Sequence, residues 1–352
     1  MQARKGTSSR SAPGEPARGE LALIERIRAR TRRSSGGLRL GIGDDCALLS
    51  SRNGEEFAVT TDLSLAGRHF RLDWHPPESV GHRALARGLS DLAAMGARPI
   101  AAFLSLGLPP ELVQKKKGRA PRSQAWVDRF FDGLLALAEA HKAPLAGGDL
   151  AQSAVAVADI VLIGAVPRGQ ALLRSGARPG HLLYVTGSLG GAAAGLARLE
   201  ELAEGSRAAG GPLKIPKKLD GLLAAHLWPQ PRIAQGLWLR RRGLASAALD
   251  VSDGLSTDLA HLCDESRVAA EVDAATLPLA AGATLDQALH GGEDYELLFT
   301  AAPTARVPRS VAGVPVTRIG RIVRRHAARP QVRLLTTEGH EPLAPRGWEH
   351  FA

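Results

Sequence analysis

Short aspartate-containing motifs, rich in Gly, Ser and Thr, recur along this chain. In order, they are Gly41-Ile-Gly-Asp44-Asp45-Cys46, Thr60-Thr61-Asp62, Ser90-Asp91-Leu92, Gly147-Gly148-Asp149 and Asp250-Val-Ser252-Asp253-Gly254. An Asp beside Gly at the end of an apolar run presents a carboxylate near unpaired backbone N–H groups, which suits hard cations bridged by phosphate oxygens. One such motif is more typical of a turn or a helix cap. Five together indicate a shared cation site, because so many converging like charges would otherwise repel.

The common phosphate-binding loops are missing from the sequence. It contains no Gly-x-x-x-x-Gly-Lys-Ser/Thr loop and no protein-kinase His-Arg-Asp and Asp-Phe-Gly pair. Gly41-x-Gly43 fails as a dinucleotide fingerprint, since Cys46 stands where a third Gly is needed. Without a P-loop lysine, phosphoryl transfer would need charge neutralisation chiefly from metal ions, and clustered carboxylates suit several Mg²⁺. Arg174 offers a planar fork for phosphate, with a surface salt bridge as the alternative.

Other segments carry polar groups that could meet a ligand. The run Gly291-Gly292-Glu293-Asp294-Tyr295 places acids at the mouth of a strand, which suits a cationic or amino-bearing substrate. His69 is as typical of a hydrogen-bonded loop as of a substrate contact, and Trp348 is either a core ring or a platform for a heteroaromatic ligand. The segment Gly187-Ser188-Leu-Gly190-Gly191 predicts a strand-to-helix turn, with an anion site at the helix N-terminus as the alternative.

The formal net charge of +10 raises the question of a nucleic-acid partner. Residues 1–33, 111–124 and 318–329 together hold more positive charge than the whole chain, so the remainder is mildly acidic. Basic stretches without interleaved aromatic residues are more typical of solvated tails and faces. We therefore expect no nucleic-acid partner, and we expect the basic loop 115–119 and the stretch 205–218 to be solvent loops.

Cysteine use and hydropathy bear on where the protein works. The chain has two cysteines, Cys46 and Cys263, in unrelated contexts, so neither a disulfide framework nor a Cys-x-x-Cys metal site is expected. No apolar run approaches the roughly 18 to 20 residues of a membrane span, so no membrane partner is expected. These features favour a cytoplasmic location.

The length of 352 residues indicates two domains. We predict a disordered leader over 1–17, an N-terminal domain over 18–166 and a C-terminal domain over 167–352. Apolar periodicity predicts helices near 21–33, 79–95, 126–140, 189–202, 222, 233 and 255–263, and strands over 38–49, 57–61, 100–108, 155–166, 182–186, 245–251, 268–272, 295–300, 316–323 and 332–335. This irregular order favours an α+β fold over a doubly wound sheet.

With these motifs in one order, the chain resembles the thiamine-monophosphate kinase family, in the superfamily of aminoimidazole ribonucleotide synthetase and selenophosphate synthetase. The resemblance runs from about Gly19 to Phe351 and includes Ala66-Gly-Arg-His-Phe70, Leu173-Arg-Ser-Gly176 and Tyr184-Val-Thr-Gly187. It implies ATP-dependent phosphorylation of thiamine monophosphate to thiamine diphosphate by direct, Mg²⁺-assisted transfer. It also implies a two-domain α+β fold of the aminoimidazole ribonucleotide synthetase type. In that fold the domain over 18–166 binds ATP and Mg²⁺ and pairs in a homodimer, and the domain over 167–352, a C-terminal α/β sandwich, completes the nucleotide and substrate site.

The resemblance also implies roles for individual residues. The implied metal ligands are Asp45, Thr60, Thr61, Asp62, Asp91, Asp149, Asp250 and Asp253. The implied ATP contacts are Gly148, Asp149, Arg174 and Ser252, and the implied catalytic residues are Asp62, Asp149 and Asp253. The positions at the thiamine end are His69, Glu293 and Trp348. The acceptor is a phosphate monoester with a second pKa of about 6, so it is mostly ionised and needs no strong general base.

Two alternatives stay open. The first is another ATP-using enzyme of the same superfamily, either a ring-closing synthetase or a selenophosphate synthetase. A selenophosphate synthetase needs a reactive Cys or selenocysteine in a Gly-rich loop near the N-terminus, whereas Cys46 follows Asp45 in a different setting. The second alternative is a basic nucleic-acid-binding scaffold that acts through the charged tails.

Overall fold

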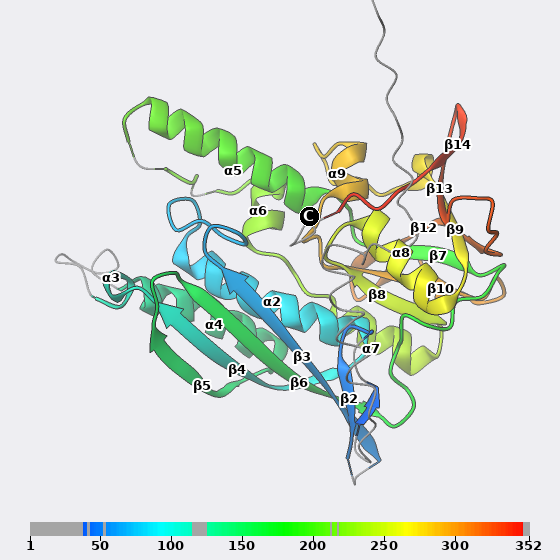
Figure 1. The fold of residues 1–352 in the computed structure, drawn as a ribbon, viewed down its shortest axis with the longest axis horizontal. Helices are drawn as coiled ribbons and strands as arrows, with labels where there is room; N and C mark the ends of the chain where they lie inside the picture. Colours follow the sequence, from blue (N-terminus) through cyan, green and yellow to red (C-terminus); the bar gives the residue numbers. More distant parts are fainter. Residues whose placement is uncertain are drawn as a thin grey trace, which may run out of the picture. The chain divides into compact units, whose positions relative to one another are not determined.

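The first half of the chain builds a six-stranded sheet in the order β1-β2-β3-β6-β4-β5 (Figure 1). Its strands are β1 (Leu38–Leu40), β2 (Ala47–Ser50), β3 (Glu55–Leu65), β4 (Arg98–Leu108), β5 (Leu145–Gln152) and β6 (Val157–Pro167). All neighbours are antiparallel except β4 and β5, which run parallel. Side chains alternate between the two faces of a strand, so on β3 Thr60 and Ser64 are buried while Thr61 and Leu63 are exposed.

Two long helices, α2 (Pro77–Ala94) and α4 (Trp126–His141), pack together, with α2 on the sheet. The short helix α3 (Pro110–Val113) follows β4. The two long helices meet at glycines: a Cβ added at Gly133 would lie 1.8 Å from the carbonyl oxygen of Glu78. A Cβ added at Gly81 would lie 1.9 Å from the carbonyl oxygen of Phe130. Only hydrogen in place of a side chain allows this backbone approach.

The second half builds an eight-stranded sheet in the order β14-β13-β9-β12-β7-β10-β8, with β11 paired to β12 (Figure 1). Its strands are β7 (Leu182–Thr186), β8 (Ala247–Val251), β9 (Ala269–Asp273), β10 (Glu296–Ala301), β11 (Ser310–Val311), β12 (Val314–Val323), β13 (Val332–Thr336) and β14 (Gly339–Pro342). The helices of this half are α5 (Gly191–Ala208), α6 (Gly221–Leu227), α7 (Ile233–Arg242), α8 (Leu255–Ser266), α9 (Leu285–His290) and the 3₁₀ turn η1 (Ala274–Thr276). Strands β13 and β9 are parallel, and the other pairs are antiparallel.

Helix α2 connects the two halves. It contacts β3, β4 and β6 of the first sheet and also β8, β10 and α7 of the second half. One continuous apolar core accordingly includes Leu92 and Met95 of α2 together with Leu297 and Phe299 of β10. A second core lies between the eight-stranded sheet and α8, and a third, smaller core joins α5 and α6 to Trp74. Polar side chains on α2 are therefore held between the two sheets.

This computed structural model describes residues 38–40, 43–51, 54–114, 125–211, 213–216 and 218–347. The predicted α+β class is confirmed, as are the helix over 79–95 and the strand over 182–186. The single strand predicted over 38–49 is wrong, because a turn at 43–46 separates β1 from β2. The stretch 205–218 was expected to be a solvent loop throughout, but α5 continues to Ala208. The predicted leader, the helix near 21–33 and the basic loop 115–119 lie outside the described residues.

Two of the aspartates expected in turns lie inside strands. Asp62 lies within β3 and Asp149 within β5, whereas Asp91 lies within α2, in agreement with the helix predicted over 79–95. At Asp149 the preceding Gly148 has a φ of +150°, and a Cβ there would lie 1.8 Å from the carbonyl oxygen of Leu104. The Gly pair before Asp149 thus allows close strand pairing and does not form a turn.

The described residues all fall in one compact unit. A domain boundary near residue 167 stays a prediction. None of the helices in the described ranges has both the length and the apolar character of a transmembrane span.

We predict that Gly133→Ala lowers the free energy of unfolding by about 1 to 3 kcal/mol, because the new methyl group must push α4 away from α2. The matched control is Gly205→Ala in α5, where no atom lies within 4 Å of the added Cβ. That change should raise stability by up to about 1 kcal/mol through helix propensity. Urea unfolding followed by circular dichroism measures both, and equal effects of the two changes would contradict the close-packing argument.

Candidate active site

Three aspartates from distant parts of the chain meet beside α2. Asp45 comes from the turn before β2, Asp91 from α2 and Asp250 from β8, and one carboxylate oxygen of each lies within 4.8 Å of the others. Asp45 and Asp250 are buried, with 8% and 2% of their surface exposed. The Thr60 hydroxyl donates a hydrogen bond to Asp91, and the Ser90 hydroxyl donates one to Asp250 at 2.5 Å. The predicted ligands Asp45, Thr60, Asp91 and Asp250 are thus brought together.

The electrostatics of this cluster are those of crowded acids. Burial and then the neighbouring Asp62, Asp250 and Asp45 raise the pKa of Asp91 well above its usual range. Burial and then Asp45 raise the pKa of Asp250 to about 8. The same two causes, in that order, raise the pKa of Asp44 to about 7. A divalent cation would favour the ionised forms of these acids.

Arg174 supplies positive charge at one side of the cluster. Its guanidinium Nη2 donates to Asp45 Oδ1 at 2.6 Å, and its backbone N–H donates to Asp44 Oδ2 at 3.1 Å. Two buried atoms, Asp45 Oδ2 and Arg174 Nε, have no hydrogen-bond partner among the described residues. An oxygen cluster with an unpartnered carboxylate oxygen fits a hard cation such as Mg²⁺, and the unpartnered Nε fits an anionic group beside it.

Asp62 lies next to this cluster on β3. Arg87 of α2 donates from Nε to Asp62 Oδ1 at 3.2 Å. Burial raises the pKa of Asp62, while Arg87 opposes that rise. Arg87 also lines a small pocket with Ser64, His69 and Arg83, so the pocket adjoins the acid cluster through the Arg87–Asp62 pair.

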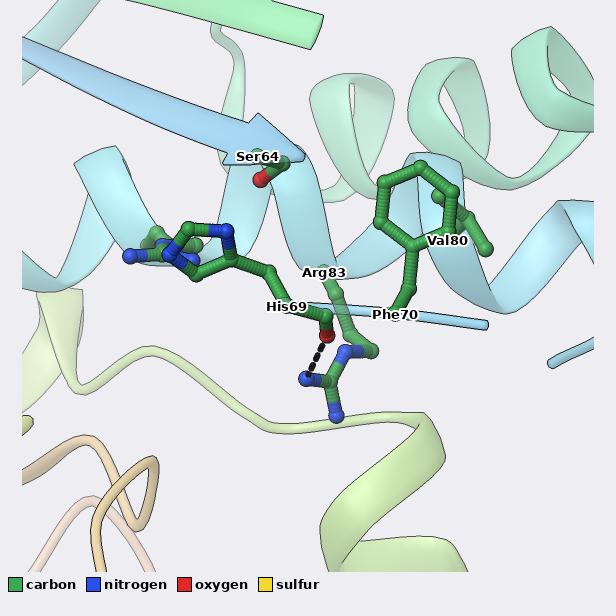
Figure 2. Close-up of a pocket in the computed structure, with 6 residues that line it drawn as sticks. Ser64, His69, Phe70, Val80 and Arg83 are labelled. Atoms are coloured by element: carbon green, nitrogen blue, oxygen red, sulfur yellow. Dashed lines mark hydrogen bonds between the residues drawn. The ribbon is translucent and has the colours of Figure 1, made fainter. Parts of the chain in front are cut away.

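The pocket is lined by residues from β3, from the loop after it and from α2, and Figure 2 shows Ser64, His69, Phe70, Val80 and Arg83 around it. Arg83 donates from Nη2 to the carbonyl oxygen of His69 at 3.1 Å, the dashed line in Figure 2. The same Nη2 donates to both oxygens of Glu293, at 2.8 and 2.7 Å. The predicted thiamine-end residues His69 and Glu293 are therefore brought together through Arg83.

Asp258 shapes the turn that carries Ser252 and Asp253. One carboxylate oxygen of Asp258 accepts hydrogen bonds from the backbone N–H groups of Ser252, Asp253 and Gly254, at 3.1, 3.1 and 3.0 Å. Asp258 is buried in the first turn of α8, where the helix N-terminus favours a carboxylate. The turn is thus fixed by a residue outside the predicted motif.

Not every predicted site residue joins the cluster. In the strand register, Asp149 of β5 lies beside Ser105 of β4, and Ser105 lies beside Asp159 of β6. Asp159 in turn lies beside Leu63 of β3. At one strand spacing per step, Asp149 is about 14 Å from β3. It is exposed on the sheet face opposite Thr60 and Asp62, as is Thr61, and the neighbouring Gly148 lies in the same exposed edge strand. Trp348 lies outside the described residues.

The N-terminus of α5 already holds an anion from the chain itself. Asp294 accepts hydrogen bonds from the backbone N–H groups of Gly190 at 2.6 Å and Ala192 at 3.1 Å. The predicted turn at 187–191 is confirmed, and the alternative of an external anion there is wrong because Asp294 occupies those donors.

Comparison with known proteins places this site in a family. The N-terminal and C-terminal domain models of the AIR synthase related proteins match residues 43–168 and 178–333. The thiamine-monophosphate kinase of Escherichia coli K12 is 39% identical over 348 residues, covering 95% of this chain and 98% of that protein. The chain belongs to the thiamine-monophosphate kinase family.

Solved structures of the thiamine-monophosphate kinase family share the fold. One, AaThiL complexed with AMPPCP and TMP, has a TM-score of 0.76 and 30% identity, covering 95% of this chain and 97% of that one. The thiamine-monophosphate kinase of Stenotrophomonas maltophilia K279a has a TM-score of 0.68 and 40% identity, covering 89% of this chain and 95% of that one.

Sequence reasoning missed three residues near the acid cluster and the pocket, namely Arg83, Arg87 and Asp258. Ser90 and Asp294 stood in the quoted motifs, but Asp294, which was expected to suit a cationic substrate, binds the backbone at the start of α5. Arg83, Arg87 and Asp91 are spaced i, i+4, i+8, which places them along one face of α2. Charged residues at that spacing in an otherwise apolar helix were the available signal.

We predict that the metal-free protein loses stability as the pH rises from about 7 to about 9, by on the order of 1 kcal/mol, a range above the one in which the buried histidines His75 and His226 affect stability. The folded-state pKa of Asp250, about 8, lies above its ordinary value of 3.8, so the folded chain keeps a proton that the unfolded chain releases. Stability from that proton is fully present at low pH and is lost as the pH rises through the folded-state value. Urea unfolding in EDTA at several pH values measures this.

Two comparisons control this prediction. Excess Mg²⁺ should reduce the loss of stability at pH 8, since the cation stabilises the ionised cluster. Asp250→Asn should flatten the pH dependence in EDTA and weaken the response to Mg²⁺. A parent protein whose stability rises over this range, with or without Mg²⁺, would show that the carboxylates are not crowded in this way.

Proposed function

We propose that the protein transfers the γ-phosphoryl group of ATP to thiamine monophosphate, giving thiamine diphosphate and ADP. An oxygen of the acceptor phosphate forms the new bond to phosphorus while the bond to the β,γ-bridging oxygen breaks. The observation that carries the proposal is the buried Asp45, Asp91 and Asp250 cluster beside Arg174, in a chain of the thiamine-monophosphate kinase family. A relative of known structure binds AMPPCP and TMP, which supports the same pair of substrates here.

The chain's own groups divide between holding cations and orienting anions. We propose that Asp45, Thr60, Asp62, Asp91, Asp250 and Asp253 hold Mg²⁺. When bound, Mg²⁺ neutralises charge on the polyphosphate and the acceptor phosphate. Arg174 orients the nucleotide phosphates through its fork, since its Nε has no protein partner in the described structure, and Ser252 contacts the same nucleotide. Asp62, Asp149 and Asp253 are the proposed catalytic residues.

No residue of the site has to act as a strong base, because the acceptor phosphate is already mostly ionised at neutral pH. The task of the site is to align two anions and prevent their repulsion. His69 and Glu293 lie at the pocket that adjoins Asp62, which supports their assignment to the thiamine end, together with Trp348.

We propose further that the protein is a homodimer paired through the outer face of the six-stranded sheet. Leu49 of β2, Phe57 and Leu63 of β3 and Phe103 of β4 are between 36% and 50% exposed there, with β6 between β3 and β4. Exposed large apolar side chains on one face of a sheet are typical of a protein interface. Thr61, Gly148 and Asp149 lie on this face or its edge strand, so their proposed ligand roles belong to the paired molecule.

The protein is proposed to work in the cytoplasm. Cys46 and Cys263 are both buried free thiols, consistent with a reducing compartment.

We predict that Asp62→Asn and Asp149→Asn each lower kcat more than about 100-fold while unfolding stays cooperative. Each change removes a charge and keeps the size of the side chain. Asp264→Asn is the matched control, since Asp264 is an exposed surface acid paired with Arg325. The assay supplies ATP, Mg²⁺ and thiamine monophosphate and detects thiamine diphosphate by chromatography. A parent protein that forms no thiamine diphosphate would refute the proposed function, and full activity in both variants would remove these two residues from the mechanism.

We predict that Leu63→Glu gives a monomer, because a further negative charge on this face, beside Asp159 of the neighbouring strand, opposes pairing. Leu196→Glu is the control, since Leu196 is 40% exposed on α5, away from the sheet. Sedimentation equilibrium should show half the parent mass for Leu63→Glu and the parent mass for Leu196→Glu. A monomeric parent protein would exclude the proposed pairing.

A further inference from the structure

Arg83 donates hydrogen bonds from its side chain to several segments around the pocket. It extends from α2, and its side chain is only 7% exposed. Besides its bonds to Glu293 and to the carbonyl oxygen of His69, it donates from Nη1 to the carbonyl oxygen of His226 at 2.6 Å. One guanidinium therefore ties together three segments that are far apart in the sequence. Two of these segments carry the residues proposed for the thiamine end.

Among the groups around Arg83 in the described structure, Glu293 is the one that carries an opposite charge, because the neighbouring histidines are neutral. Burial and then Arg83 lower the pKa of His226 well below its usual range, so this neighbour is neutral. Burial and then Arg83 also lower the pKa of His75 to about 4, and the two histidine Nε2 atoms lie 3.0 Å apart. Glu293 is thus the anionic partner of Arg83, while both histidines fill the space behind the guanidinium without competing charge.

The ionisation and the position of the Glu293 carboxylate depend on Arg83. Burial alone would raise the pKa of Glu293, but the charges of Arg83 and then Arg87 outweigh burial and hold the pKa at about 2. Its backbone has a φ of +67°, a conformation that a non-glycine residue adopts only when its surroundings impose it. The side chain is 27% exposed, so a ligand can still reach it. An ion pair that reaches both carboxylate oxygens fixes where that carboxylate lies.

We propose that Arg83 is a positioning residue for the phosphoryl acceptor: it fixes Glu293 and the His69 loop in the arrangement that binds the thiamine end. This inference rests on the proposed function. Arg83 is on the same face of α2 as Arg87 and Asp91, so it also relates the acceptor pocket to the acid cluster. Lysine keeps the charge but lacks the planar fork, so it cannot reproduce bonds to three segments at once.

The test compares Arg83→Lys and Arg83→Gln with the parent chain in steady-state kinetics. Arg83→Lys should raise the KM for thiamine monophosphate by about 10-fold to 100-fold, the range for a lost charge-assisted hydrogen bond. The KM for ATP and kcat should change less than about 2-fold, because the acid cluster is untouched. Arg83→Gln should raise the acceptor KM at least as much. Arg129→Lys is the matched control, since Arg129 makes a similar two-bond ion pair with Glu78 on the far side of α2, and it should leave both KM values unchanged.

A double-mutant cycle separates positioning from general stabilisation. If Arg83 acts through Glu293, then Glu293→Gln should raise the acceptor KM in the parent but have little further effect in the Arg83→Lys background. Fully additive effects, or equal increases in the KM for ATP and for thiamine monophosphate, would overturn the proposal.

Folding and the proposed function are checked separately. Cooperative urea unfolding is required of each variant, and if neither Arg83 variant folds then Arg83 is a structural residue and the proposal fails. A parent chain that does not phosphorylate thiamine monophosphate would refute the proposed function itself. A fully active parent together with an Arg83→Lys variant of unchanged acceptor KM would refute only this inference.

Discussion

Repulsion between buried carboxylates is the constraint on which the rest of this structure depends. Asp45, Asp91 and Asp250 come from a turn, a helix and a strand, and their oxygens lie within 4.8 Å of one another. Hydroxyl donors and Arg174 offset only part of that repulsion, as the raised pKa of Asp250 indicates. The packing of both halves against α2 must therefore hold these acids together against their repulsion. A site that is costly without its ligands is suited to bind them tightly, because binding relieves the repulsion.

The helix α2 sets the geometry of the site. Its buried polar face carries Arg83 at the acceptor pocket, Arg87 beside Asp62, and Asp91 in the acid cluster. At a rise of 1.5 Å per residue, the eight residues from Arg83 to Asp91 span about 12 Å. A rigid helix thus fixes the separation between the acceptor pocket and the cation site, whereas loops would let it vary. Both sheets contact the helix, so each half of the chain contributes to that separation.

Helices and strands with a clear apolar periodicity could be predicted from the sequence, but which distant residues meet in the folded chain could not. The helix over 79–95 was readable from its spacing, and the motifs identified Asp91 and Asp250 as site candidates. Strand alternation separates Thr60 from Thr61, so two adjacent motif residues face opposite sides of the sheet. Asp149 was treated as one more acidic turn, but sheet order, which no local pattern encodes, puts it on the outer edge. Arg83 was overlooked, because arginine in a helix usually marks the solvent-exposed face, whereas here α6 and the loop before β10 lie against it.

The close backbone contacts between α2 and α4 at Gly81 and Gly133 have a consequence for how such a site can change over time. The two backbones interlock at these positions, so α2 cannot slide along its axis or rotate without a clash. A shift of one residue would carry Asp91 by 1.5 Å along the axis and about 100° around it, out of reach of its partners. Gly81 and Gly133, which have no side chains and bind no ligand themselves, therefore fix the position of α2 and with it the position of Asp91. Residues at the rim of the pocket can be substituted during evolution, provided that these two glycines are kept and the acids stay aligned.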